Sequence, residues 1–346
     1  MQERIQWLDN AKGWGILLVM IGHTNLPGPT NIWVYSFHLP LFFFVSGYLF
    51  NPNKFYNTFE LIKAKARTLL IPYFSFSLII LLFDTLVEYS KLWVVGGYNY
   101  SSIINQFIGM FVQMRSTELS GVCWFLTLLF ISEILLYWVL RSSKNNDTKS
   151  LLLLVASFIS GWFYMKIVRV PLPWHVDAGL VANFFVGMGY HAKKYESRIA
   201  KLIKYRILLL ALGVSLVCTY INYLLIGTRV DLYYSELGNP ILFIIVSMSG
   251  VLASIIAIRK LPNPRFAGYI GRNSLTYYAL HATVFYVVLN MILSRILRVV
   301  TENELLISYI QPILCVWLTC VLMVPVCYII NNYLPFILGR KRMQQK

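Results

Sequence analysis

Ten long apolar stretches constrain the fold of this sequence more than any other feature. A helix needs about 20 mostly apolar residues to cross the hydrocarbon core of a bilayer. Because the backbone inside a membrane must satisfy its own hydrogen bonds, such stretches predict transmembrane helices. We therefore predict an all-α, polytopic membrane helix bundle with about ten spans, at residues 11–25, 31–50, 68–88, 122–141, 150–167, 177–192, 205–226, 239–258, 274–297 and 306–332.

The composition agrees with a membrane protein that has no separate soluble domain. Of the 346 residues, 58% are hydrophobic and 13% are charged, whereas a soluble domain carries about 25% charged residues. We therefore predict one integral membrane domain over residues 1–346. No small-residue cleavage site follows the polar residues 1–10, so we expect the first span to be retained. The five cysteines lie in apolar stretches, and we interpret them as buried free thiols.

The distribution of basic residues predicts the orientation in the membrane. If the N-terminus is cytoplasmic, 22 of the 30 lysines and arginines fall in cytoplasmic segments and seven in outer segments. Basic residues collect on the cytoplasmic side of membrane proteins, so this split favours two cytoplasmic termini and an even number of spans. The net charge of +16 is then explained without a nucleic acid. We expect membrane lipids, and no nucleic acid, as partners.

Lys12 and His23 are ionisable residues in the first apolar stretch. At about 100° per residue, eleven residues bring His23 back to within about 20° of Lys12, so both lie on one helix face. Along the helix axis they are about 16 Å apart. Ionisable groups at such depth usually line a polar path or a reaction site.

His38 follows in the second apolar stretch. The short link between the first two spans makes them antiparallel neighbours, so the imidazoles of His23 and His38 could approach each other near the outer side. Histidine suits proton abstraction because its pKa lies near the working pH. The alternative is that each histidine caps a helix or bonds a buried carbonyl. No spacing typical of metal ligands supports a metal site, and we predict none.

Three basic residues, Lys63, Lys65 and Arg67, stand before the third span. The simpler interpretation is that they anchor the span on the cytoplasmic side. The alternative is that they bind the phosphates of a cytoplasmic nucleotide cofactor.

Three more residues are candidates for binding a substrate. Trp124 opens the fourth span, where a tryptophan usually lies at the membrane interface. Asp177 ends a polar cluster in an outer loop that could bind a sugar, and His281 lies deep in the ninth span, where a cap does not explain it.

Four passages together form a specific combination that extends over most of the chain. They are residues 4–23 with Lys12 and His23, residues 37–48, the basic run that ends at residues 70–73 together with residues 124–126, and residues 270–275 leading to His281. This combination resembles the acyltransferase 3 family of integral membrane acyltransferases, most closely its fucose-4-O-acetylase-like sugar O-acetyltransferases. Lys12 stands where many members have arginine.

The resemblance implies transfer of an acyl group, most often acetyl, from cytoplasmic acetyl-CoA. The acceptor would be a hydroxyl of a cell-envelope glycan or lipid-linked sugar at the outer side, and the location a bacterial inner membrane. On this basis we predict His23 as general base, oriented or assisted by His38, with Asp9 orienting Lys12. The alternative is a covalent acyl-imidazole on His23. Lys12 and the three basic residues before the third span would hold CoA, while Trp124, Asp177 and His281 would bind the acceptor.

Two other classes of protein are alternatives. A transporter or flippase for a polyprenyl-linked glycan would use the polar intramembrane residues as a path, but no internal inverted repeat is visible. A structural subunit of an envelope assembly would not explain why Lys12, His23 and His38 occur together. The oligomeric state stays open.

Overall fold

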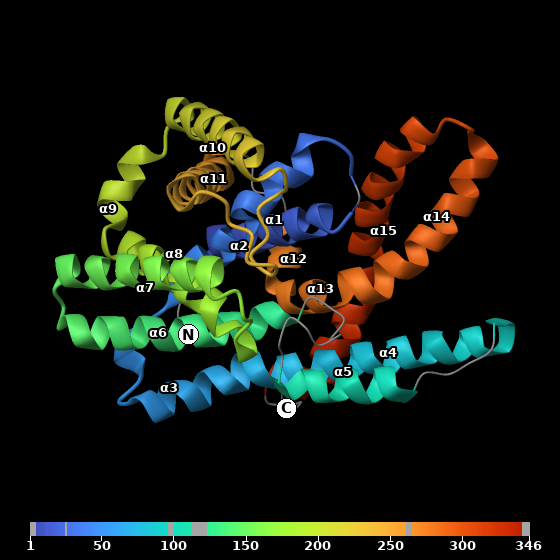
Figure 1. Cartoon of the computed structure of the whole chain (residues 1–346), viewed down its shortest axis with the longest axis horizontal. Helices are drawn as coiled ribbons and strands as arrows, with labels where there is room; N and C mark the ends of the chain where they lie inside the picture. The colour runs from blue at the N-terminus through green and yellow to red at the C-terminus, as the bar shows by residue number, and fades with distance from the viewer. Residues whose placement is uncertain (1–4, 25, 96–99, 113–122, 261–264, 341–346) are drawn as a thin grey trace.

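A computed structural model describes residues 5–24, 26–95, 100–112, 123–260 and 265–340 (Figure 1). Within these residues the protein consists of helices, and the only strand pairing is an isolated bridge between Asp231 and Glu236. The α-helices are α1 (Gln6–Gly22), α2 (Pro29–Leu49), α3 (Thr58–Lys65), α4 (Ile71–Val95), α5 (Tyr100–Val112), α6 (Trp124–Ser143), α7 (Asp147–Ile167), α8 (Val176–Lys194), α9 (Glu196–Ile199), α10 (Tyr205–Ile226), α11 (Pro240–Lys260), α12 (Arg265–Arg272), α13 (Ser274–Leu280), α14 (Val287–Val300) and α15 (Glu304–Tyr333).

Eight helical stretches in the described part of the chain are long and apolar enough to cross a membrane, and they match eight of the ten predicted spans. The fold is therefore an all-α, polytopic membrane bundle, as predicted. The five cysteines are free, and four of them are buried. The eight stretches are Pro29–Leu49, Thr58–Val87, Trp124–Ser143, Asp147–Ile167, Tyr205–Ile226, Pro240–Lys260, Ser274–Val300 and Glu304–Tyr333.

The two remaining predicted spans, 11–25 and 177–192, correspond to α1 and α8, which have 17 and 19 residues. Both helices pack against α2, and most of their residues are buried. Figure 1 shows α1 and α2 between α6 to α8 on one side and the hairpin of α14 and α15 on the other. Because protein surrounds α1 and α8, they can carry ionisable residues that a lipid-facing helix excludes.

Glycines bring α12 directly against α1. A Cβ atom added to Gly271 would lie 1.7 Å from the backbone oxygen of Asp9, and one added to Gly13 would lie 1.9 Å from that of Ala267. The opposing atoms are backbone, so they cannot move aside as a flexible side chain would. These contacts fix the end of α12 beside the beginning of α1.

Gly271→Ala is therefore expected to destabilise the protein by about 3 kcal/mol, because the added methyl group forces the two helices apart. Thermal unfolding of the detergent-purified protein measures this effect. Gly213→Ala on α10 is the matched control, since a Cβ there meets no atom within 4 Å. If Gly271→Ala unfolds at the same temperature as the control, the close approach of α1 and α12 does not contribute to stability.

Candidate active site

A cavity of about 560 Å³ opens where α1 ends, and we name it the histidine cavity. His23, the residue that caps α1, lines this cavity together with His38 of α2. Trp124, at the beginning of α6, also lines it. Three residues that the sequence singles out on three separate helices therefore meet at one cavity.

The ring of His281 lies against that of His23, with their centroids 5.1 Å apart. His281 begins a π-helical turn, His281–Tyr286, between α13 and α14, and such turns are frequent at functional sites. Its Nδ1 lies 3.0 Å from the carbonyl oxygen of Tyr277 and 2.8 Å from that of Tyr278. The tertiary structure thus adds a third imidazole beside His23.

Contacts with carbonyl oxygens show which ring nitrogen of His38 and of His281 carries the proton when the imidazole is neutral. Nδ1 of His38 lies 2.8 Å from the carbonyl oxygen of Val34. Because a carbonyl oxygen only accepts, Nδ1 donates in both His38 and His281, and Nε2 keeps its lone pair. Nε2 of His281 is buried and has no hydrogen-bond partner in the part of the chain that the structure describes. It is an acceptor available to a new donor.

The loop between α10 and α11 forms another wall of the histidine cavity. The guanidinium of Arg229 lies 3.7 Å from the centre of the Tyr35 ring and donates a hydrogen bond of 2.9 Å to Asn31. Its Nη2 lies 3.5 Å from the carboxylate of Asp231. Burial raises the pKa of Asp231, and the Arg229 guanidinium offsets only part of this effect. The wall therefore presents a fixed cation and a carboxylate to the cavity.

Arg229 and Asp231 were not predicted as site residues, because neither belongs to a recognisable motif. One signal was present: an Arg-x-Asp pair in a short segment between two apolar spans. Arg229 is one of seven basic residues on the predicted outer side, where anchoring on the cytoplasmic side does not explain them.

A second, mostly apolar cavity of about 230 Å³ adjoins the first, and we name it the apolar cavity. Val19, Leu39 and Tyr278 line both cavities, so the two are direct neighbours. Lys12 lies in the wall of the apolar cavity.

One face of α1 lines these two cavities. Lys12, Ile16 and Val19 line the apolar cavity, and Val19 and His23 line the histidine cavity. Steps of four, three and four residues stay on one side of a helix. The face on which the sequence predicts Lys12 and His23 is thus the face that borders both cavities.

A third cavity of about 170 Å³ lies next to the apolar cavity at Lys12, and we name it the basic cavity. Lys12, Ser274 and Leu275 line both the apolar and the basic cavity. Arg272 and Arg340 add two guanidinium groups to the wall of the basic cavity. The three cavities therefore adjoin in series, from basic through apolar to histidine.

The two arginines of the basic cavity differ in how they are held. Arg340 donates a hydrogen bond of 2.9 Å to Asn331, whose amide donates one of 2.7 Å to Asn273. The guanidinium of Arg272 makes no hydrogen bond or ion pair with any residue that the structure describes. Guanidinium and ammonium groups around a small cavity are suited to phosphate.

The basic residues predicted before the third span occupy other places. None of Lys63, Lys65 and Arg67 lines the three cavities. Lys63 is exposed on α3, and Lys65 forms an ion pair of 2.9 Å with the buried Glu133 of α6. Nε of Arg67 donates a hydrogen bond of 2.8 Å to the carbonyl oxygen of Gly339. Lys65 and Arg67 thus join separate elements of the bundle.

The two predicted aspartates lie on different helices. Asp9 is buried on α1, three residues before Lys12 and therefore on the same side of that helix. Asp177 is buried in the first turn of α8 and lines a fourth cavity instead of the histidine cavity.

Comparison with known proteins decides the family. A family model described as an acyltransferase domain, Acyl_transf_3, matches residues 5–332. The chain belongs to the acyltransferase 3 family. No significant match was found among curated proteins or among solved structures.

The matched region of this membrane acyltransferase contains every residue that lines the histidine and apolar cavities. Of the basic cavity, only Leu338 and Arg340 lie beyond it. Residue 4, with which the first of the four sequence passages begins, lies outside the described residues.

Proposed function

We propose that this acyltransferase moves an acetyl group from cytoplasmic acetyl-CoA to a hydroxyl of a cell-envelope glycan or lipid-linked sugar. Transfer takes place at the outer side of a bacterial inner membrane. The observation that carries this proposal is the series of three adjoining cavities along α1, basic at one end and lined by imidazoles at the other.

The donor is expected to lie along this series. Lys12, Arg272 and Arg340 bind the phosphates of CoA in the basic cavity, because their charges converge there. The pantetheine arm follows the apolar cavity beside Ile16 and Val19. The face of α1 from Lys12 to His23 is about 16 Å long, so an extended arm brings the thioester close to the histidine cavity.

His23 is the general base of the proposed reaction. It takes the proton of the acceptor hydroxyl while the hydroxyl oxygen attacks the acetyl carbonyl carbon of the thioester. The carbon–sulfur bond then breaks, and the proton passes from His23 to the thiolate. The products are an acetyl ester and free CoA.

His281 and His38 position His23 and the substrate. When His23 takes a proton, its ring gains a second N–H donor, and the buried Nε2 of the neighbouring His281 is an acceptor without a partner among the described residues. His38 presents its Nε2 from α2, and Trp124 offers an aromatic surface for a sugar ring.

Glycan analysis of a strain without the gene tests the proposal. We expect mass spectrometry of the envelope glycan to show the loss of one acetyl group per modified unit, and the wild-type gene to restore it. An unchanged acetylation state of the glycan in the deletion strain would rule out this glycan as the acceptor. A transporter defect would instead leave acetylated glycan on the wrong side of the membrane.

A further inference from the structure

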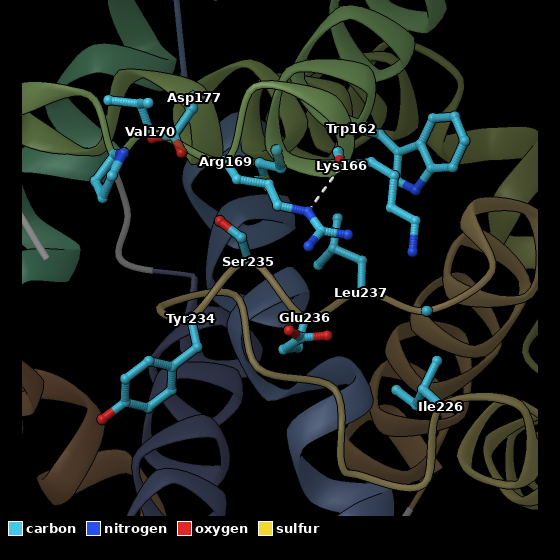
Figure 2. Close-up of a pocket in the computed structure, with 13 residues that line it drawn as sticks. Trp162, Lys166, Arg169, Val170, Asp177, Ile226, Tyr234, Ser235, Glu236 and Leu237 are labelled. Carbon is cyan, nitrogen blue, oxygen red and sulfur yellow. Dashed lines mark hydrogen bonds between the residues drawn. The ribbon is translucent and has the colours of Figure 1, made fainter.

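A fourth cavity, of about 450 Å³, lies beside the histidine cavity, and we name it the Arg169 cavity. Trp162 and Lys166 of α7 and Arg169 in the following loop line one side of it. Tyr234 and Glu236, in the loop between α10 and α11, line the other side (Figure 2). Tyr234 also lines the histidine cavity, so the two cavities are neighbours.

A single turn separates the two cavities. Asp231 and Glu236 form a bridge with backbone hydrogen bonds of 2.7 and 2.9 Å. Asp231 and Tyr233, in the first half of the turn, line the histidine cavity, and Ser235 and Glu236, in the second half, line the Arg169 cavity. A ligand that reaches over Tyr234 would therefore contact both halves of the turn.

Two hydrogen bonds of the Asn222 side chain hold this turn in place. The amide of Asn222 on α10 donates a hydrogen bond of 3.0 Å to the carbonyl oxygen of Leu237 and accepts one of 2.9 Å from the backbone of Asn239. Ser235 has a positive φ of 62°, a conformation that costs energy in a residue other than glycine. The position of Glu236 is thus specified by the fold.

Lys166, Arg169, Asp177 and Glu236 are the charged residues that line the Arg169 cavity. Nε of Arg169 donates a hydrogen bond of 3.1 Å to the carbonyl oxygen of Lys166, which leaves its two terminal nitrogens available. Figure 2 shows Arg169 extending toward the turn that carries Glu236. Within the described residues, however, the Glu236 carboxylate forms no ion pair with Arg169 or Lys166. A donor and an acceptor on opposite walls suit a ligand with several hydroxyl groups.

We propose that the Arg169 cavity binds the sugar unit adjacent to the one that is acetylated. This inference rests on the proposed function, because it places the reacting unit in the histidine cavity. Arg169 donates to hydroxyl oxygens, Glu236 accepts from hydroxyl groups, and the half-buried Trp162 offers an aromatic surface. Acceptors with at least two sugar units are then bound more tightly than single sugars.

Acetyl transfer to long and short acceptors tests this inference. The long acceptor is glycan extracted from a strain without the gene, and the short acceptor is the single sugar unit released from it. The variants are Arg169→Gly, which relieves the positive φ of 58° at this position, and Glu236→Ala. Arg298→Ala is the control, since this arginine is exposed, forms an ion pair with Glu304 and does not line the Arg169 cavity.

In both variants we expect the KM for the long glycan to rise about tenfold, the loss expected for one hydrogen bond to a charged group. The kcat, the KM for acetyl-CoA and the KM for the single sugar should stay at wild-type values, and the control should match wild type throughout. An unchanged KM for the long glycan, or an equal rise for the single sugar, overturns the inference. If the wild-type protein acetylates neither acceptor, the proposed function fails and the inference fails with it.

Discussion

His23→Ala is expected to lower the rate of acetyl transfer by at least about 100-fold, since general-base catalysis contributes about 10²–10⁴-fold. The physical reason is that, among the described residues, no other imidazole both lines the histidine cavity and lies at the end of the α1 face that borders the apolar cavity. Transfer of labelled acetyl from acetyl-CoA to glycan from a strain without the gene measures the rate.

His191→Ala is the matched control for His23→Ala. His191 lies near the end of α8, contacts Ser150 at 3.1 Å and lines none of the three cavities. At equal amounts of protein in the membrane, this variant should keep its activity. Near-normal transfer in His23→Ala would eliminate His23 as the base.

His281→Phe tests whether His281 positions His23 or binds the substrate. The substitution removes the unpartnered Nε2 of the ring that lies against His23 and keeps an aromatic ring there. We expect kcat to fall about tenfold, as for one lost hydrogen bond to a charged group, while the KM for acetyl-CoA stays unchanged. A rise in KM with an unchanged kcat would assign His281 to substrate binding, as the sequence analysis predicts.

Arg272→Ala and Arg340→Ala are each expected to raise the KM for acetyl-CoA by about tenfold to 100-fold, the effect of losing a charge-assisted hydrogen bond to phosphate. The KM for acetyl-pantetheine should not change, because this donor lacks the phosphates and the nucleotide. Steady-state kinetics with the two donors measure the difference, and a folding defect would affect both donors alike.

Lys63→Ala is the control that compares the two candidate phosphate sites. Lys63 is exposed on α3 and lines none of the three cavities. We expect it to leave the KM for acetyl-CoA unchanged. A larger effect in Lys63→Ala than in Arg272→Ala would favour the segment before the third span as the phosphate site.

Much of the fold was predictable from the sequence, because hydropathy and helix period are local properties. Eight predicted spans match apolar helices, and the two remaining ones correspond to α1 and α8. At 17 residues α1 is shorter than the about 20 that a span needs, and α1 and α8 both pack against α2 with most of their residues buried. The two π-helical turns, Ala66–Leu70 and His281–Tyr286, were not predictable from composition.

The sequence singled out His23, His38 and Trp124 of the histidine cavity, but helix geometry placed only residues of the same helix relative to each other. Lys12 and His23 share a face of α1 because eleven residues are close to three full turns. Basic character alone did not distinguish Lys65 and Arg67, which hold elements together, from Arg272, which borders a cavity. The difference depends on partners, Glu133 and the backbone of Gly339, that lie far away in the chain.

By itself the sequence determined the membrane class, the acyltransferase 3 resemblance and the common face of Lys12 and His23, since these depend on composition, order and helix geometry. Only the tertiary structure placed His281 against His23, Arg272 and Arg340 beside Lys12, and the turn of Glu236 between two cavities. The physical reason is that helix packing decides these contacts. It depends on close approaches such as Gly271 to Asp9, which no local pattern encodes.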